Sequence, residues 1–157
     1  MGSLTLEDLR IEDMSFPHSV LAGCETALCV FAAGFLGRQD AFWVADAGLR
    51  ATVVDSDPMM VKQMRKMYPP SWDWRIIDAY RFATDEEWDV VTLDPWTNQF
   101  QLCADHLPAW CRMARHAVVL GTGIDTDVVA PPGWEITDVR QRSDYDGGVF
   151  WTVLEPT

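Results

Sequence analysis

Residues 49–60 read LRATVVDSDPMM, an apolar run that passes through two acids and a proline into two methionines. The β-branched residues before Asp55 predict a buried strand. Pro58 stands where proline is preferred, in the first turn of a helix, and Asp57 before it is placed to cap that helix. A strand followed so closely by a helix is the repeating unit of an α/β fold. Asp55 then ends the strand either as a turn former or as a side chain held out for binding.

The same alternation of strand and helix continues on both sides of this segment. Apolar runs bounded by turn-forming residues predict five strands, at 27–34, 49–55, 74–80, 88–96 and 117–123. Helical patterns predict three helices, at 38–48, from Pro58 onward, and at 98–115 with a restart at Pro108. A terminal antiparallel hairpin is predicted from residues 133–144 and 147–155.

These elements together predict an α/β fold of three layers, with helices on both faces of a mainly parallel seven-stranded sheet whose last strand is antiparallel. The continuous apolar run at 27–34 suits a strand covered on both faces, so we expect it near the centre of the sheet. At 157 residues, with 48% hydrophobic residues and eight tryptophans, the chain fits a single domain. Residues 1–26 are expected to form an N-terminal helical segment and residues 27–157 the α/β core.

The charge of the chain limits the classes of partner that it can bind. Twelve lysines and arginines against 24 aspartates and glutamates give a net charge of −12 and a pI near 4.4. A protein that grips duplex DNA normally presents a basic face, because release of counterions from phosphates supplies much of the affinity. The basic cluster of Lys62, Arg65 and Lys66 falls near the C-terminal end of a predicted helix, where cations meet the helix dipole favourably. We therefore expect no autonomous nucleic-acid binding.

Residue patterns also bear on the compartment, the thiols and metal binding. No apolar run approaches the roughly 20 residues that span a bilayer, so we expect no membrane segment and a cytoplasmic protein. The four cysteines show no CxxC spacing and lie in apolar stretches, which predicts buried, reduced thiols. The three histidines lack the spacing of a catalytic triad or a metal site, and no metal centre is predicted.

Three consecutive predicted strands end in acids, at Asp55, Asp78 and Asp94. In open α/β sheets, ligands bind outside the carboxyl ends of the strands, near the point where the strand order reverses. Burial of three carboxylates at one edge without partners would be costly. A cationic or hydroxyl-rich ligand would supply such partners, whereas each acid alone is also a common helix cap or turn former. The set therefore predicts a binding cleft at this edge.

Over residues 27–157 the chain resembles the class I S-adenosylmethionine-dependent methyltransferases. The resemblance rests on four segments in the family's order, VVDSDPMMVKQM (53–64), IIDAY (76–80), LDPW (93–96) and GGVFWTVLE (147–155). The last of these fits the reversed final strand of that family. The resemblance implies a Rossmann-like fold, S-adenosylmethionine as the cofactor and methyl transfer as the activity.

The resemblance also implies roles for single residues in the nucleoside half of the cofactor site. Asp55 would bind the ribose hydroxyls, and Ser56 and Asp57 would line the adenosine side. Asp78 would receive the adenine amine, with Ala79 beside the ring. These five residues are therefore predicted to contact or surround the adenosine.

The fourth-strand segment would lie next to the reacting methyl group. Asp94 could accept a hydrogen bond or a proton from an amine acceptor. Trp96 could stack on a flat acceptor or pack at the pocket rim. LDPW has one proline fewer than the corresponding segment of amine-methylating relatives, so an amine-bearing acceptor is suggested rather than implied.

The first loop departs from the family pattern of an acid followed by closely spaced glycines. Here the stretch reads FAAGFLG (31–37), with alanines or a phenylalanine in the place of the acid and the glycines three apart. Gly34 and Gly37 would still permit close approach of the backbone to the cofactor. The missing acid removes an expected contact to the amino-acid end of the cofactor.

Four functions stay open from the sequence alone. The first is S-adenosylmethionine-dependent methyl transfer to an acceptor that bears an amine or another nucleophile. The second is a catalytically inactive methyltransferase-like module that acts through a protein partner, which the altered first loop and the acidic composition favour. The others are an acidic decoy that imitates nucleic acid, supported by charge alone, and a nucleotide-binding α/β protein of another kind.

Overall fold

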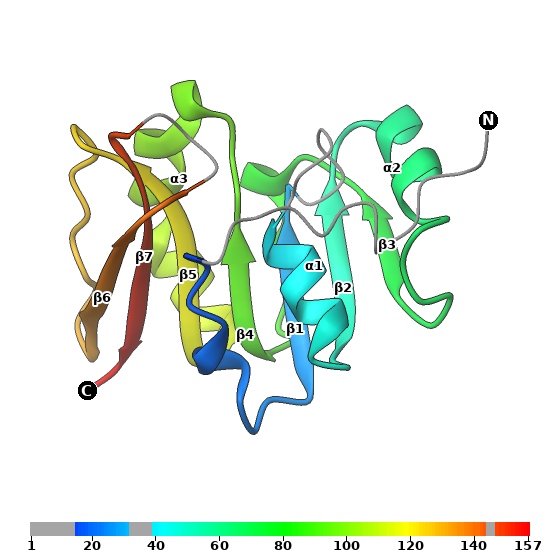
Figure 1. Ribbon diagram of the computed structural model, residues 1–157, viewed down its shortest axis with the longest axis horizontal. Helices are drawn as coiled ribbons and strands as arrows, with labels where there is room; N and C mark the ends of the chain where they lie inside the picture. Colours follow the sequence, from blue (N-terminus) through cyan, green and yellow to red (C-terminus); the bar gives the residue numbers. More distant parts are fainter. Residues whose placement is uncertain (1–14, 32–38, 144–146) are drawn as a thin grey trace.

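One sheet of seven strands organises the part of the chain that the structure describes. The structure is a computed structural model that describes residues 15–31, 39–143 and 147–157. The strands lie in the order β3-β2-β1-β4-β5-β7-β6 (Figure 1). Their bounds are Thr26–Val30 for β1, Arg50–Asp55 for β2, Asp73–Ile76 for β3, Trp88–Leu93 for β4, Ala114–Gly123 for β5, Trp134–Gln141 for β6 and Val149–Pro156 for β7.

The directions of the strands confirm the expected sheet. Strands β1 to β5 pair in parallel wherever they are neighbours, whereas β7 is antiparallel to both β5 and β6. The chain runs from β1 outward through β2 to β3 and then returns to place β4 on the other side of β1. The strand order therefore reverses between β1 and β4, which is where α/β sheets of this kind bind ligands.

Helices cover both faces of the sheet and complete the three layers. Helices α1 (Gln39–Asp46) and α2 (Pro58–Met64) pack on one face, and α3 (Phe100–Asp105) and α4 (Leu107–Met113) pack on the other. In Figure 1, α1 lies in front of the sheet and α3 behind it. Three short 3₁₀ helices complete the described elements, η1 at His18–Leu21, η2 at Ala79–Arg81 and η3 at Thr97–Gln99.

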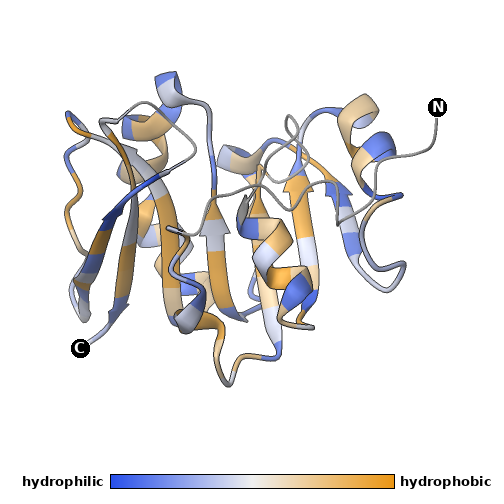
Figure 2. Cartoon of the chain, in the orientation of Figure 1, coloured by the Kyte–Doolittle hydropathy of each residue, from blue (hydrophilic) through white to orange (hydrophobic). Residues whose placement is uncertain are grey.

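The central strand β1 shows why the sequence specifies a sheet that is buried on both faces. Successive side chains of a strand point to opposite faces. Ala27 and Cys29 accordingly join the core under α1 and α2, while Leu28 and Val30 join the core under α3 and α4. All four side chains are fully buried, and Figure 2 shows β1 and its neighbours as more apolar than the edge strands β3 and β6. A strand apolar on both faces is stable only in a central, covered position.

Several predicted elements end earlier in the structure than in the prediction. Strand β1 ends at Val30, four residues before the predicted end, and Phe31 follows with a positive φ of 67°. Strand β3 ends at Ile76, and a 3₁₀ turn replaces the predicted continuation of the strand to residue 80. The predicted restart near Pro108 is confirmed, because α4 begins there with the proline in its first turn.

The carboxylate of Asp89 holds the beginning of β1 against β4. Its Oδ2 accepts hydrogen bonds from the backbone N–H of Glu25 at 2.7 Å and of Thr26 at 3.2 Å. The hydroxyl of Thr26 in turn accepts from the Asp89 N–H at 3.0 Å. Hydrogen bonds to the charged form favour it, so these amides, led by that of Glu25, hold the pKa of the Asp89 carboxyl below its ordinary value.

The segment before β1 packs against the far end of the sheet. The ring of Phe16 is fully buried and meets the indole of Trp151 edge to face, with centroids 5.1 Å apart. The Ser15 hydroxyl accepts a hydrogen bond from the backbone N–H of Ser143 at 3.1 Å. Over the described ranges, no helix combines the length and the apolarity needed to cross a membrane.

The predicted burial of the cysteines is confirmed for three of the four. None of the four thiols is in a disulfide; Cys29, Cys103 and Cys111 are buried, and Cys24 is partly exposed. Burial disfavours the thiolate and raises the pKa of Cys29 and Cys103 far above the ordinary range, and that of Cys111 to about 12. These thiols therefore act as apolar core groups rather than as nucleophiles.

Candidate functional site

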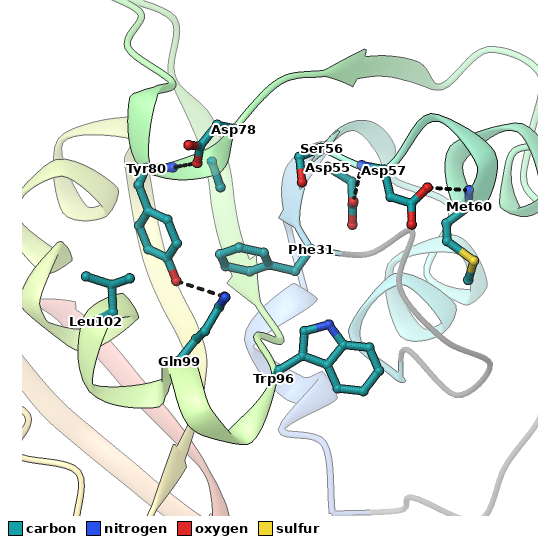
Figure 3. Close-up of a pocket in the computed structure, with 11 residues that line it drawn as sticks. Phe31, Asp55, Ser56, Asp57, Met60, Asp78, Tyr80, Trp96, Gln99 and Leu102 are labelled. Carbon is teal, nitrogen blue, oxygen red and sulfur yellow. Dashed lines mark hydrogen bonds between the residues drawn. The ribbon is translucent and has the colours of Figure 1, made fainter.

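A pocket of about 640 Å³ opens at the carboxyl ends of the strands on either side of the reversal point (Figure 3). This volume lies within the range of about 300–1,000 Å³ that is usual for small-molecule sites. The lining residues end or follow β1, β2, β3 and β4, or belong to α2, η2, η3 and α3. They are Phe31, Asp55, Ser56, Asp57, Met60, Asp78, Ala79, Tyr80, Trp96, Gln99 and Leu102.

Asp55 and Asp57 both line the pocket, and both also hold the turn between β2 and α2. Asp57 caps α2, since its Oδ1 accepts from the backbone N–H of Met59 at 3.0 Å and of Met60 at 3.2 Å. The Asp57 N–H donates to Oδ1 of Asp55 at 3.0 Å. The predicted cap is confirmed. Asp55 is a turn residue and a pocket residue at once, and its exposure is only 9%.

The wall beyond β3 is formed by the η2 turn. Oδ1 of Asp78 accepts from the backbone N–H of Tyr80 at 3.0 Å and so caps η2, while its side chain stays half-exposed. Ala79 is buried at the base of this wall. The Tyr80 hydroxyl donates to Oε1 of Gln99 at 3.4 Å, which joins the wall to the segment after β4. The structure therefore brings Asp78 and Ala79 to the same pocket as Asp55.

Phe31 is a pocket residue that the sequence analysis did not single out. It follows β1 directly, and its N–H donates to the Val54 carbonyl oxygen at 2.9 Å. In Figure 3 its ring points across the pocket toward Tyr80, and the two ring centroids are 5.7 Å apart. The signal was present in the first loop, where a phenylalanine stands near the usual place of an acid. Gly34 and Gly37 of that loop lie outside the described residues.

Beyond β4 the structure separates two residues that were expected side by side in the cleft. Trp96 lines the pocket with 56% of its surface exposed. Asp94 does not line it and is 1% exposed. Its Oδ1 lies 2.8 Å from Nη1 of Arg142, whose guanidinium carbon stands 3.9 Å from the ring centroid of Trp151. Asp94 was expected to face the cleft; in the structure its carboxylate is buried in an ion pair with Arg142, which follows β6, and it is absent from the described pocket lining.

The pocket has an acidic lining. Asp55, Asp57 and Asp78 contribute carboxylates, and no lysine, arginine or histidine lines the pocket among the described residues. Such a lining repels phosphate groups and attracts ligands that carry hydroxyls or positive charge. Over the same residues, no group of three or more His, Cys, Asp or Glu side chains is arranged to hold a metal ion.

The fold is shared with solved methyltransferases. The crystal structure of TrmN from Thermus thermophilus superposes with a TM-score of 0.68 at 19% identity, over 99% of this chain and 50% of TrmN. Magnesium protoporphyrin IX methyltransferase (ChlM) from Synechocystis PCC 6803, with bound SAM, superposes with a TM-score of 0.65 at 12% identity, over 88% of this chain and 75% of ChlM. The fold is that of the class I methyltransferases.

A third solved structure extends the likeness over the whole of a methyltransferase. The N-methyltransferase NodS from Bradyrhizobium japonicum WM9, in complex with S-adenosyl-L-homocysteine, superposes with a TM-score of 0.63 at 15% identity, over 96% of each chain. The present chain spans only half the length of TrmN. No protein-family model and no curated protein matches the sequence. The likeness thus establishes the fold alone.

Proposed function

We propose that this chain binds S-adenosylmethionine in the pocket at the carboxyl ends of β1 to β4 and transfers its methyl group to an acceptor. The observation that supports this most directly is the order of side chains along that edge. Asp78 and Ala79 follow β3, Asp55 ends β2, and Trp96 follows β4. The nucleoside would lie over β3 and β2, and the reacting end would lie over β1 and β4.

The lining fits this cofactor better than a phosphorylated nucleotide. A carboxylate such as that of Asp55 can accept two hydrogen bonds from vicinal hydroxyls, as a ribose presents them. Asp78 can accept from an exocyclic amine, and the methyl group of Ala79 offers an apolar contact beside a flat ring. The acidic lining opposes the phosphates of dinucleotides but suits a ligand with a positively charged sulfur. The pocket is also large enough, at about 640 Å³.

When bound, S-adenosylmethionine supplies a methyl group that is already activated on its sulfonium sulfur. The task of the protein is therefore to orient the two reactants and to exclude water from between them. Trp96, exposed at the rim, provides a flat surface on which an acceptor can stack. The acidic surroundings favour the approach of an acceptor that bears an amine.

We propose only a positioning role for Asp94 in methyl transfer. Its carboxylate is engaged with Arg142 and lies outside the pocket lining. We assign it the role of fixing the segment that begins at the end of β4, and so of placing Trp96, two residues later, at the rim. Proton transfer from an amine acceptor to Asp94 would require the amine to reach a carboxylate whose residue is only 1% exposed.

Calorimetric titration tests the proposal. The parent protein is titrated with S-adenosylmethionine and with S-adenosylhomocysteine, and both are expected to bind. Asp55→Ala is expected to weaken binding about 10- to 150-fold, the scale of a lost hydrogen bond to a charged group. Asp85→Ala, an acid on an exposed turn outside the pocket, is the matched control and should leave both affinities unchanged. Absence of binding to the parent, or equal affinities in Asp55→Ala and the parent with an unchanged circular dichroism spectrum, would refute it.

A further inference from the structure

The pocket divides into an acidic half and an aromatic half. Along the carboxyl edge of the sheet, in the order β3, β2, β1 and β4, the residues at or just after the strand ends are Asp78, Asp55, Phe31 and Trp96. Neighbouring strands lie about 4.8 Å apart. A ligand laid along this edge would therefore pass from two carboxylates to two aromatic rings over three strand spacings, about 14 Å.

The chemistry of the proposed cofactor fixes which part of it would meet the aromatic half; this step rests on the proposed function. With the ribose hydroxyls on Asp55 at the end of β2, the sulfur is joined to the ribose by a single methylene group. It would therefore lie about one strand farther along the edge, above the end of β1. Phe31 stands at that strand end, and Trp96 stands beyond the next strand.

We infer that the rings of Phe31 and Trp96 recognise the positive charge of the sulfonium, so that the pocket distinguishes the methyl donor from its demethylated product. A cation near the face of an aromatic ring is attracted by the ring quadrupole, and more strongly where water is excluded. The donor carries this charge on sulfur, and the product, a neutral thioether, does not. The carboxylates of the acidic half also attract the positively charged donor more than the neutral product.

The settings of the two rings are unusual for residues that serve packing alone. Trp96 keeps 56% of its surface exposed, so burial in the core does not account for its position. Phe31 has a φ of 67°, a backbone conformation that bulky residues rarely adopt, and its ring is directed into the pocket (Figure 3). Phe31 also stands near the place where the family pattern has an acid. An aromatic face there offers the cofactor a cation-binding surface of a different kind.

The test compares the affinities for two ligands that differ in charge at one atom. S-adenosylmethionine and S-adenosylhomocysteine are titrated into the parent and into Phe31→Leu and Trp96→Leu, which keep apolar bulk but remove the aromatic face. Each variant is expected to bind S-adenosylmethionine about two- to thirty-fold more weakly, while its affinity for S-adenosylhomocysteine stays within about twofold of the parent. Trp96→Phe keeps an aromatic ring, so it should retain most of the parent's preference for S-adenosylmethionine over S-adenosylhomocysteine, which Trp96→Leu loses. Retained binding of S-adenosylhomocysteine also shows that the variant is folded.

A matched control separates charge recognition from pocket shape. Leu102→Ala removes apolar surface from the wall of the same pocket without touching a ring, and it should change both affinities by the same factor. If the aromatic variants also change both affinities equally, or change neither, the rings contribute shape alone and the inference is overturned. If the parent binds neither ligand, the proposed function itself fails. Should Phe31→Leu not fold, Trp96→Leu alone decides between these outcomes, because Trp96 is largely exposed.

Discussion

Replacement of Arg142 by methionine tests whether the buried ion pair with Asp94 holds the end of the sheet together. The Arg142 side chain is 1% exposed and that of Asp94 is 2% exposed. Their closest atoms, Nη1 and Oδ1, are 2.8 Å apart. Methionine keeps the length and much of the apolar bulk of the arginine side chain, so the substitution removes mainly the charge and the hydrogen bonds.

The expected magnitude follows from the burial of both groups. Removal of one partner from a buried ion pair costs about 3–5 kcal/mol of unfolding free energy, because the remaining charge lies in surroundings that solvate it poorly. The guanidinium also stands 3.9 Å from the ring centroid of Trp151, and a methionine sulfur near that ring replaces only part of this contact. For a chain of this length, such a loss corresponds to a fall in Tm of roughly 6–20 °C.

Urea unfolding followed by tryptophan fluorescence measures the effect, with a neighbouring arginine as the control. Arg140 lies two residues earlier, and its ion pair with Asp138 is exposed on both sides. Arg140→Met is expected to cost no more than about 1 kcal/mol, as exposed pairs do. The double variant Arg142→Met with Asp94→Leu removes both charges, and it should recover most of the loss caused by Arg142→Met alone.

Two results would refute this reasoning. The first is an unfolding free energy for Arg142→Met that equals that of Arg140→Met. The second is a double variant whose loss equals the sum of the losses of the two single variants, because independent sites add and coupled sites do not. Either result would mean that the two charges are not energetically coupled, whatever the distance between them.

Three further predictions concern the Asp57 cap of α2, the stability of the protein at acidic pH and the cysteine thiols. Asp57→Ala should lower the unfolding free energy by about 0.5–2 kcal/mol, because the α2 cap is lost, and it should keep most of the affinity for S-adenosylmethionine. Thermal melts with and without the ligand measure both effects. A larger loss of affinity than in Asp55→Ala would contradict this prediction. The amide of Glu25 lowers the pKa of Asp89 in the folded state, so the stabilisation it provides is present above the unfolded pKa of about 3.8 and is lost as the pH falls through the folded value. Urea unfolding between about pH 5 and pH 2 should therefore show that the unfolding free energy falls more steeply with decreasing pH in the parent than in Asp89→Asn. Equal slopes in the two proteins would exclude this contribution of Asp89 to stability. Ellman's reagent should modify about one thiol quickly in the native chain, that of Cys24, and four after denaturation; fast reaction of more than one native thiol would be inconsistent with the buried core.

The sequence predicts the fold where local chemistry and burial agree. The strand that ends at Asp55 and the helix capped by Asp57 lie where predicted, because β-branched residues, a capping acid and a proline all favour the same arrangement. The predicted hairpin forms β6 and β7, and the last strand is antiparallel as expected. The edge of the sheet on which Asp55, Asp78 and Trp96 gather also follows from the strand order.

Strand ends are less predictable, because an apolar residue suits a strand and a pocket floor equally well. Phe31 continues the apolar run of β1 but adopts a positive φ and lines the pocket. Ile77 stands one residue beyond the end of β3, in a segment whose composition still resembles a strand. Ile77 is itself exposed, so at these positions the pattern of hydrophobic residues marks neither burial nor the point where pairing between strands stops.

The environment of Asp94 could not be predicted, because its partner is distant in the sequence. Arg142 follows β6, 48 residues later, and comes near Asp94 only because the β6–β7 hairpin pairs with β5, the neighbour of β4. Local sequence shows an acid after a strand and gives no sign of a buried arginine opposite it. A side chain that faces a ligand and one that faces an ion-pair partner look alike until the sheet is assembled.

The position of β7 has a consequence for the order in which the molecule can form. Strand β7 follows β6 in the chain but lies between β5 and β6 in the sheet. During synthesis, β6 therefore emerges with no strand to pair with, and it must wait for residues 149–156 to arrive and insert beside β5. Until then the Trp151 ring is missing from the place where Phe16 and Arg142 meet it. A nascent chain whose β7 residues have not yet emerged from the ribosome should consequently remain open to proteases along β5, even though β1 to β5 have already been synthesised.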